Sequence, residues 1–197
     1  MLKRPEAVAF YARLPEGAKP SQKQISALAV QLVTDKAAEL YRLPKDELAF
    51  GTHEFGKPYF KDHPEVKFNI SHSGRYILFA LSALEIGVDV QEKRVMDVSK
   101  LGPKVFSEDE YREFLMHEDR QEEFFRCWVL KEAYVKWTGQ GLLKGLADLP
   151  MTGWHQYIMV DTDYFAAIWA GRPLELSVDE CLITDAMLKE AGIEEEE

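Results

Sequence analysis

Residues 124–142 read FFRCWVLKEAYVKWTGQGL, and this stretch organises the interpretation of the whole chain. Its apolar and aromatic residues recur at helical spacing, no proline interrupts them, and two glycines follow, so the pattern predicts a helix. At 3.6 residues per turn, Trp128, Glu132 and Lys136 fall on one ridge, about one turn apart. A Glu followed four residues later by a Lys is also the favoured order of a surface ion pair, and the stretch alone favours that simpler interpretation.

Composition indicates a globular protein of 197 residues with 46% hydrophobic and 29% charged residues and a net charge of −10. No basic stripe offsets this charge, which argues against a general nucleic-acid-binding protein. The two cysteines are isolated and fit neither a disulfide framework nor a metal knuckle. Since no apolar run approaches the roughly 20 residues of a membrane span, and the first residues lack a signal-peptide core, we expect a cytoplasmic protein without a membrane partner.

The first half of the chain predicts one amphipathic helix and three strands. Residues 21–42 carry a helical apolar stripe, with Ser21 as a candidate N-cap. Residues 67–72 and 75–84 read as a hairpin around a Ser-Gly turn, and residues 87–91 read as a third strand. Burying a carboxylate such as that of Asp89 in an apolar strand costs desolvation free energy, unless the carboxylate is paired, lies at the mouth of a pocket or binds a metal. From the sequence of this strand alone, an exposed position of Asp89 at the edge of a sheet is an equally good interpretation.

The second half predicts two further helices and a sheet. Ser107 and Glu110 have the spacing of a capping box, which predicts a helix through Leu115. After a charged hinge comes the helix that contains Glu132. Residues 154–160, 163–170 and 174–180 read as short strands of one antiparallel sheet.

Five motifs together resemble one enzyme family. They are FGKP, FNISHS, GVDVQ, FSEDEY and WVLKEAYVKWTGQGL, at residues 55–58, 68–73, 87–91, 106–111 and 128–142. Any one of them is weak evidence, but their order and approximate spacing are similar to those of the Sfp-type 4′-phosphopantetheinyl transferases. The resemblance implies an α+β fold built as a pseudo-twofold pair of small lobes, with antiparallel sheets and long helices. We expect the lobes at residues 1–96 and 97–197, with coenzyme A between them.

The resemblance also implies the reaction: transfer of the 4′-phosphopantetheine arm of coenzyme A to a serine of a carrier protein, with release of adenosine 3′,5′-bisphosphate. Attack of a hydroxyl on a pyrophosphate requires charge neutralisation and in-line positioning, which Mg²⁺ helps to supply. Mg²⁺ takes few carboxylates and completes its octahedron with phosphate oxygens and water. We expect Asp89 and Glu132 to be its carboxylate ligands. Gln91 stands where the family usually has a second acid, so we expect weaker metal binding or a water held by the amide.

Further roles come from the same resemblance. Lys136 is expected to contact the phosphate and the departing oxygen, and Glu132 to take the serine proton, directly or through a metal-bound water. His72 is similar to the histidine that grips a coenzyme A phosphate. The other residues expected at coenzyme A are Ser71, Lys57 and, in place of an arginine that the family usually carries, Lys23. Lys131 is expected to flank the site without performing chemistry.

The carrier protein is expected to dock beside the cleft on the second lobe. Candidates for this contact are Phe106, Tyr111 and the loop 139–143, with steering charges at Lys100, Lys104 and Lys144. Ordinary core packing is at least as good an interpretation of Phe106. Fatty-acid, polyketide and nonribosomal-peptide carriers all remain open as acceptors, and we expect a monomer. The alternative function is a catalytically weak homologue that binds coenzyme A or a carrier protein without efficient transfer.

Overall fold

A four-stranded and a three-stranded β-sheet, packed between helices, position most of the residues singled out above, and a separate two-stranded sheet follows the first long helix in the chain. The computed structural model describes residues 5–141 and 145–194. The helices are α1 (Gln22–Tyr41), the 3-10 turn η1 (Lys45–Glu47), α2 (Val98–Val105), α3 (Glu108–Met116), α4 (Arg120–Thr138) and α5 (Asp185–Glu190). The strands are β1 (Ala7–Arg13), β2 (Phe50–Thr52), β3 (Pro58–Phe60), β4 (Lys67–Ser73), β5 (Tyr76–Ser82), β6 (Ile86–Glu92), β7 (Trp154–Ile158), β8 (Tyr164–Ala170) and β9 (Leu176–Glu180).

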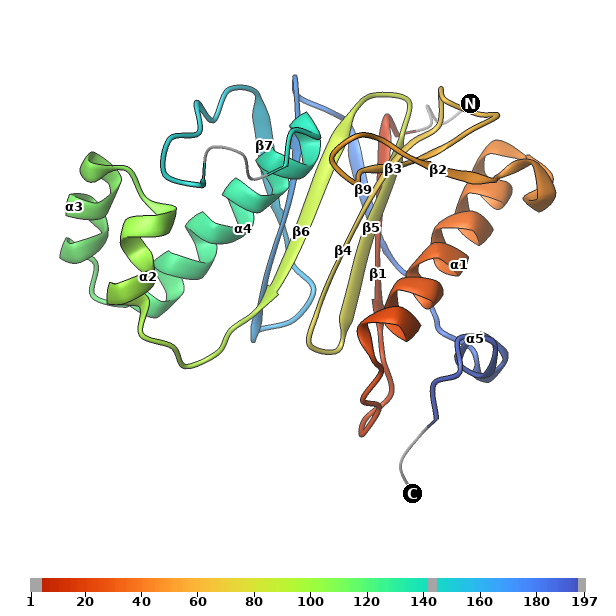
Figure 1. Ribbon diagram of the computed structural model, residues 1–197, viewed down its shortest axis with the longest axis horizontal. Helices are drawn as coiled ribbons and strands as arrows, with labels where there is room; N and C mark the ends of the chain where they lie inside the picture. Colours follow the sequence, from red (N-terminus) through yellow and green to blue (C-terminus); the bar gives the residue numbers. More distant parts are fainter. Residues whose placement is uncertain (1–4, 142–144, 195–197) are drawn as a thin grey trace.

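The first sheet has the strand order β4-β5-β1-β9, and helix α1 covers one of its faces (Figure 1). Helix α1 begins at a complete capping box, in which Ser21 and Gln24 satisfy each other's backbone N–H groups. Its apolar stripe packs on alternate residues of the strands, among them Phe10, Phe68 and Phe79. The apolar side chains of α5 add to this cluster. One hydrophobic core therefore lies between α1 and the first sheet.

The second sheet has the order β6-β8-β7 and stacks on the other face of the first sheet. Val88 and Val90 of β6 share a buried cluster with Leu78 and Ala80 of β5. Helix α4 covers the outer face of the second sheet, where Val129 and neighbouring residues pack on β8. Figure 1 shows the resulting order from right to left: α1, first sheet, second sheet, α4, and then α2 and α3.

Several sequence predictions are confirmed. The α+β class with antiparallel sheets and two long helices is correct, because α1 and α4 each cover one sheet. The β4–β5 hairpin forms with Gly74 at φ 53°, a left-handed conformation that glycine adopts readily. Helix α3 begins at the predicted Ser107–Glu110 capping box. Across the described ranges, with residues 1–4, 142–144 and 195–197 left aside, no helix is long and apolar enough to cross a membrane.

The last predicted strand does not join the sheet that we expected. β9 pairs in parallel with β1 of the first sheet, whereas β7 and β8 pair in the second. The sequence prediction was wrong on this point because strand pairing between distant segments leaves no local pattern. Conversely, β6 precedes residue 97 but pairs with β8. Both sheets therefore take strands from either side of residue 96, and the division into lobes 1–96 and 97–197 stays a prediction.

Candidate functional site

The carboxylate of Asp89 is the centre of the site. It lies on β6 with only 1% of the residue exposed, so the surface-edge interpretation is wrong. Its Oδ1 accepts hydrogen bonds from the Ser71 hydroxyl at 2.7 Å and from Lys136 Nζ at 2.6 Å. Its Oδ2 accepts one from Gln91 Nε2 at 2.8 Å. A buried charge requires such partners, because an unpaired carboxylate in an apolar interior carries a large desolvation cost.

Gly87 explains how α4 comes so close to β6. A Cβ atom at this position would lie 2.1 Å from the Ala133 carbonyl oxygen and 2.3 Å from the Trp137 backbone nitrogen. The helix backbone therefore rests directly on the strand, which only a residue without a side chain permits. As a result, Lys136 reaches Asp89 and forms its ion pair there. Among the described residues its ammonium has no ion pair with Glu132, and the surface-pair interpretation is wrong.

Glu132 lies one turn before Lys136 on the same ridge of α4. Burial raises the pKa of its carboxyl above the usual 4.5, and the neighbouring Asp89 carboxylate raises this pKa further. The Lys136 ammonium opposes both effects without cancelling them. The structure thus brings two carboxylates of unequal character together, one held by three donors and one with a raised proton affinity.

His72 lies beside a basic hollow between the start of α1 and the β4–β5 turn. Its pKa is lowered from the usual 6.5 by burial and, less strongly, by the Lys136 charge, while Asp89 opposes the shift. The hollow has a volume of about 580 Å³ and includes Lys19, Arg75 and Arg94. Neither arginine was predicted from the sequence. Arg75 directly follows the Ser73-Gly74 turn of the motif that contains His72, a position that could have pointed to it.

Lys23 is placed differently from His72. It is exposed on the first turn of α1, and it is not among the described residues that line the basic hollow. Lys57 lines a separate pocket of about 220 Å³ together with Asn69 and Lys136. Its ammonium donates to Glu85 at 2.9 Å and to the carbonyl oxygens of Ile86 and Trp137. Lys57 thus ties the loop before β3 to the end of α4. The coenzyme A contacts of both lysines stay predictions.

Lys131 has a structural position next to Glu132. Only 2% of it is exposed, and its ammonium donates to Glu110 Oε2 at 2.7 Å and to the Leu146 carbonyl oxygen at 3.1 Å. The same Glu110 oxygen accepts the backbone N–H of Ser107 at 2.7 Å, at the start of α3. One buried cation therefore joins α3, α4 and the segment after α4.

The predicted carrier contacts divide into buried, exposed and undescribed residues. Phe106 is 3% exposed and stacks on Phe114, so the core-packing interpretation holds for it. Lys100 and Lys104 are exposed, and Lys100 pairs with Asp97 at 3.0 Å. Lys144 and residues 142–143 of the predicted docking loop lie outside the described residues.

The donor set fits a metal ion that is shared with a ligand. No group of three or more His, Cys, Asp or Glu side chains within 5–141 and 145–194 is arranged to hold a metal by itself. Asp89 and Glu132 would supply two carboxylates, and the Gln91 amide, whose Nε2 donates to Asp89, would supply one neutral oxygen. Mg²⁺ suits such a sparse set, because it takes its remaining ligands from phosphates and water.

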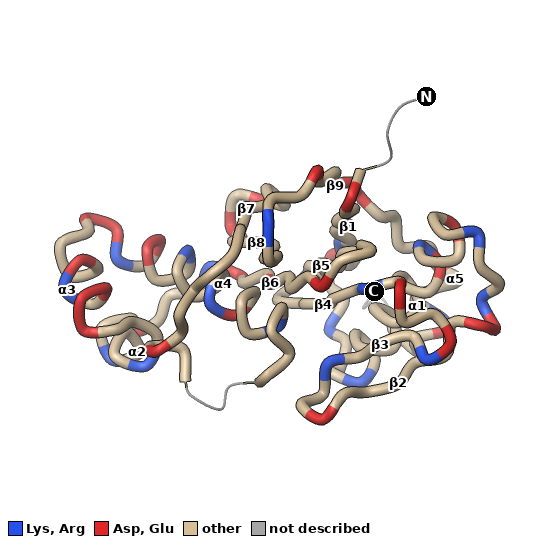
Figure 2. Tube along the Cα trace, turned by 90° about the horizontal axis from the view of Figure 1, so that it is seen from above, with Lys and Arg blue, Asp and Glu red and all other residues tan. Residues whose placement is uncertain are grey.

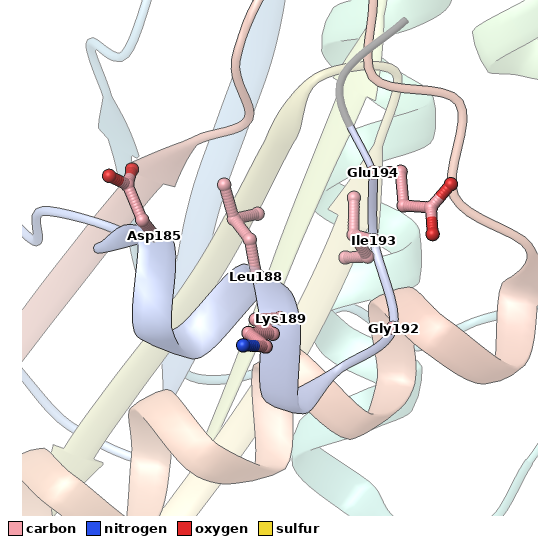
Figure 3. Close-up of a pocket in the computed structure, with 6 residues that line it drawn as sticks. All are labelled: Asp185, Leu188, Lys189, Gly192, Ile193 and Glu194. Atoms are coloured by element: carbon pink, nitrogen blue, oxygen red, sulfur yellow. The ribbon is translucent and has the colours of Figure 1, made fainter.

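A further hollow of about 400 Å³ lies against α5. Figure 3 shows its lining, with Asp185, Leu188 and Lys189 on the helix and Gly192, Ile193 and Glu194 on the segment that follows. None of the predicted site residues contributes to it. Its two acidic side chains and single lysine do not resemble a phosphate site.

Comparison with known proteins agrees with this geometry. Residues 85–169 match the family model of the 4′-phosphopantetheinyl transferase superfamily. The chain is 35% identical over 114 residues to the 4′-phosphopantetheinyl transferase Sfp of Bacillus subtilis, covering 56% of this chain and 50% of that protein. It is 36% identical over 111 residues to psf-1 of Bacillus pumilus, covering 55% and 47% of the two chains. For gsp of Aneurinibacillus migulanus the values are 30% over 119 residues, covering 59% and 49%.

The matched part of the chain spans about half the length of each of these relatives. The family match begins at Glu85, directly before β6, and ends at Trp169 in β8. It therefore includes Asp89, Glu132 and Lys136, the three charged residues that meet in the structure. The chain resembles the Sfp-type enzymes, and its residues 85–169 are similar to the 4′-phosphopantetheinyl transferase superfamily.

Proposed function

We propose that this protein transfers the 4′-phosphopantetheine arm of coenzyme A to a serine of an acyl- or peptidyl-carrier protein in the cytoplasm. The products are the holo carrier and adenosine 3′,5′-bisphosphate. The observation that carries the proposal is the meeting of Lys136 and Asp89 at 2.6 Å beside Glu132, whose pKa is raised. A protein that only bound its ligand would have no need of an acid–base pair at this position.

The reaction breaks one bond and forms one. The serine oxygen attacks the phosphorus that carries the pantetheine arm, and the bond from this phosphorus to the bridging oxygen breaks. Glu132 takes the serine proton, a role that its raised pKa favours because a stronger base accepts a proton more readily. The leaving oxygen departs with the electron pair of the broken bond, and Lys136 stabilises its charge. Ser71 and Asp89 fix the lysine for this task at 2.8 and 2.6 Å.

The surroundings of the site suit a phosphorylated co-substrate. His72, Arg75 and Arg94 lie around the basic hollow, and cationic and imidazole N–H groups are good partners for phosphate oxygens. Asp89, Glu132 and Gln91 would hold Mg²⁺, which when bound neutralises the charge that develops on the pyrophosphate. With Gln91 in place of an acid, this set carries less negative charge, and we expect moderate metal affinity.

Intact-mass spectrometry of an apo carrier protein tests the proposal. The carrier is incubated with this protein, coenzyme A and Mg²⁺, and parallel samples contain EDTA or the Asp89→Asn variant. We expect a gain of one phosphopantetheine on the carrier that is lost with EDTA and strongly slowed by Asp89→Asn. If wild-type protein gives no gain with fatty-acid, polyketide or peptidyl carriers while it still binds coenzyme A, the proposal is wrong. The binding homologue would then replace it, although no present observation favours that alternative.

A further inference from the structure

The two sheets meet along two edge strands that do not pair through their backbones. β4 is the first strand of the order β4-β5-β1-β9, and β6 is the first strand of the order β6-β8-β7. β6 pairs on one side with β8, so the N–H groups on its other side point toward β4. Buried backbone N–H groups require acceptors, and a second strand would ordinarily supply its carbonyl oxygens.

Here the acceptors are side chains of β4. The Asn69 amide oxygen accepts the Val88 N–H at 2.8 Å. The hydroxyl oxygens of Ser71 and Ser73 accept the next two alternate N–H groups of β6, from Val90 at 3.3 Å and from Glu92 at 3.0 Å. These three hydrogen bonds repeat every second residue on both strands, so they form a ladder between side chains and backbone. We call Asn69, Ser71 and Ser73 the ladder residues.

The ladder holds the part of β6 that carries Asp89. Asp89 lies between Val88 and Val90, whose N–H groups make the first two contacts. Asn69 is 4% exposed, so its bond to Val88 is shielded from water. Ser71 also donates to Asp89 and is part of the site, whereas Asn69 has no hydrogen bond to Asp89 among the described residues.

We propose that Asn69 is a positioning residue, which fixes β6 against β4 and thereby holds Asp89 within the transfer site. The ladder also sets the distance between the two halves of the ligand site. His72, on β4 between Ser71 and Ser73, lines the basic hollow, while Asp89 lies on β6 of the second sheet, which α4 covers. The role of Asn69 in the transfer reaction rests on the proposed function. Its role in attaching β6 to β4 does not depend on that function.

Asn69 also borders the pocket that contains Lys57, and a direct contact with ligand must be separated from positioning. The pair Asn69→Ala and Asn69→Ser does so. Both variants remove the amide from the pocket. Only serine keeps an oxygen that can accept the Val88 N–H, as the hydroxyls of Ser71 and Ser73 accept the N–H groups of Val90 and Glu92. Positioning therefore predicts that Asn69→Ser recovers most of the function that Asn69→Ala loses.

Three measurements test the proposal on the full chain: amide hydrogen exchange of residues 86–92, binding of Mn²⁺ followed by EPR, and transfer to a carrier protein. Asn69→Ala should speed exchange at Val88 and weaken Mn²⁺ binding about 10- to 100-fold, as expected when the support of a metal ligand is lost. Ser82→Ala is the matched control, since Ser82 is buried on β5 and its hydroxyl donates to the Glu6 carbonyl oxygen at 2.9 Å and accepts the Leu84 N–H at 3.0 Å, and neither partner belongs to β6. This control should leave Mn²⁺ binding unchanged.

Two results would overturn the positioning role. One is that Asn69→Ala changes exchange at Val88 and Mn²⁺ binding no more than Ser82→Ala does. The other is that Asn69→Ser is as defective as Asn69→Ala, which would indicate a direct ligand contact. If wild-type protein transfers nothing to any carrier, the proposed function fails, and the exchange of Val88 still decides whether Asn69 fixes β6.

Discussion

At the residue scale, the site combines groups that are individually unfavourable for folding. Glu132 has a raised pKa because its carboxyl is buried near a second carboxylate, and His72 has a lowered pKa because its ring is buried near an ammonium. Each shift means that the charged form is destabilised in the folded protein. Such strain is common where a protein uses the same groups for chemistry, and it makes the residues testable by both stability and activity.

Replacing Glu132 by Gln should reduce transfer by orders of magnitude and yet stabilise the protein at neutral pH. Because the folded-state pKa is raised above 4.5, the folded protein binds this proton more tightly than the unfolded chain does. The stabilisation from the protonated carboxyl is complete below pH 4.5 and is lost as pH rises through the raised pKa. The melting temperature of Glu132→Gln relative to wild type should therefore be higher at pH 8 than at pH 4. A difference that stays the same at both pH values would contradict the raised pKa.

Gln91→Glu should change stability in opposite directions without and with metal. The substitution removes the donor that holds Asp89 Oδ2 and places a second carboxylate beside it. Repulsion between the carboxylates should lower the melting temperature in EDTA, while the added charge should strengthen Mg²⁺ binding and raise the melting temperature in excess Mg²⁺. Gln91→Leu, which also lacks the donor, controls for its loss. A Gln91→Glu protein that responds to Mg²⁺ as Gln91→Leu does would show that residue 91 is not near the metal.

The residues of the centre could be predicted because each lies in a short motif with family spacing. Asp89, Glu132 and Lys136 meet as expected, although their separate roles are not tested by the structure. The arginines of the basic hollow were missed. Arg75 follows the His72 motif directly but lies outside it, and only the fold brings Arg94 to the same hollow. The hydrogen bonds of Lys57 and Lys131 likewise depend on tertiary neighbours that no local pattern encodes.

At the element scale, the position of α4 on β6 decides the geometry of the site. Gly87→Ala should destabilise the protein by about 1–3 kcal/mol or more, since the added methyl group meets rigid backbone atoms of α4. Urea unfolding measures this loss. Gly171→Ala is a suitable control, because its Cβ would only approach the Trp137 side chain at 3.3 Å. If the two variants unfold at the same urea concentration, the close approach of α4 to β6 is not as described.

The ion pair between Lys131 and Glu110 should respond asymmetrically to mutation. Glu110→Leu leaves an ammonium without its carboxylate partner in a position that is 2% exposed, and we expect a loss of about 3–5 kcal/mol. Lys131→Met should cost less, because the side chain of Glu110 is 42% exposed and water can solvate its charge. Denaturant unfolding of the two variants tests this order. Equal losses, or a larger loss for Lys131→Met, would contradict the burial of the lysine.

The elements themselves were predictable where their signals are local. Capping boxes mark α1 and α3, and the Ser73-Gly74 turn marks the β4–β5 hairpin. The partners of β6 and β9 were not predictable, because both pair with strands that are distant in sequence. Helix α2 also had no clear local signal, and it contains Pro103, which usually discourages a helix interior.

At the scale of the whole molecule, the charge of the basic hollow differs from that of the rest of the protein. Figure 2 shows acidic residues along α3 and around α1, with basic residues interspersed, in a chain whose net charge is −10. The basic hollow at His72 is therefore a local exception on an acidic molecule. It lies between the start of α1, the β4–β5 turn and Arg94, which follows β6.

The proposed function requires that the Asp89–Lys136–Glu132 site couple cleavage of coenzyme A to modification of the carrier. A single-turnover reaction tests this most directly, with adenosine 3′,5′-bisphosphate measured by chromatography and holo carrier by mass spectrometry in the same samples. We predict that the two products appear at the same rate and in equal amounts, and that Lys136→Met slows both alike. Release of bisphosphate without holo carrier, or formation of both products at the wild-type rate by Lys136→Met, would contradict the account.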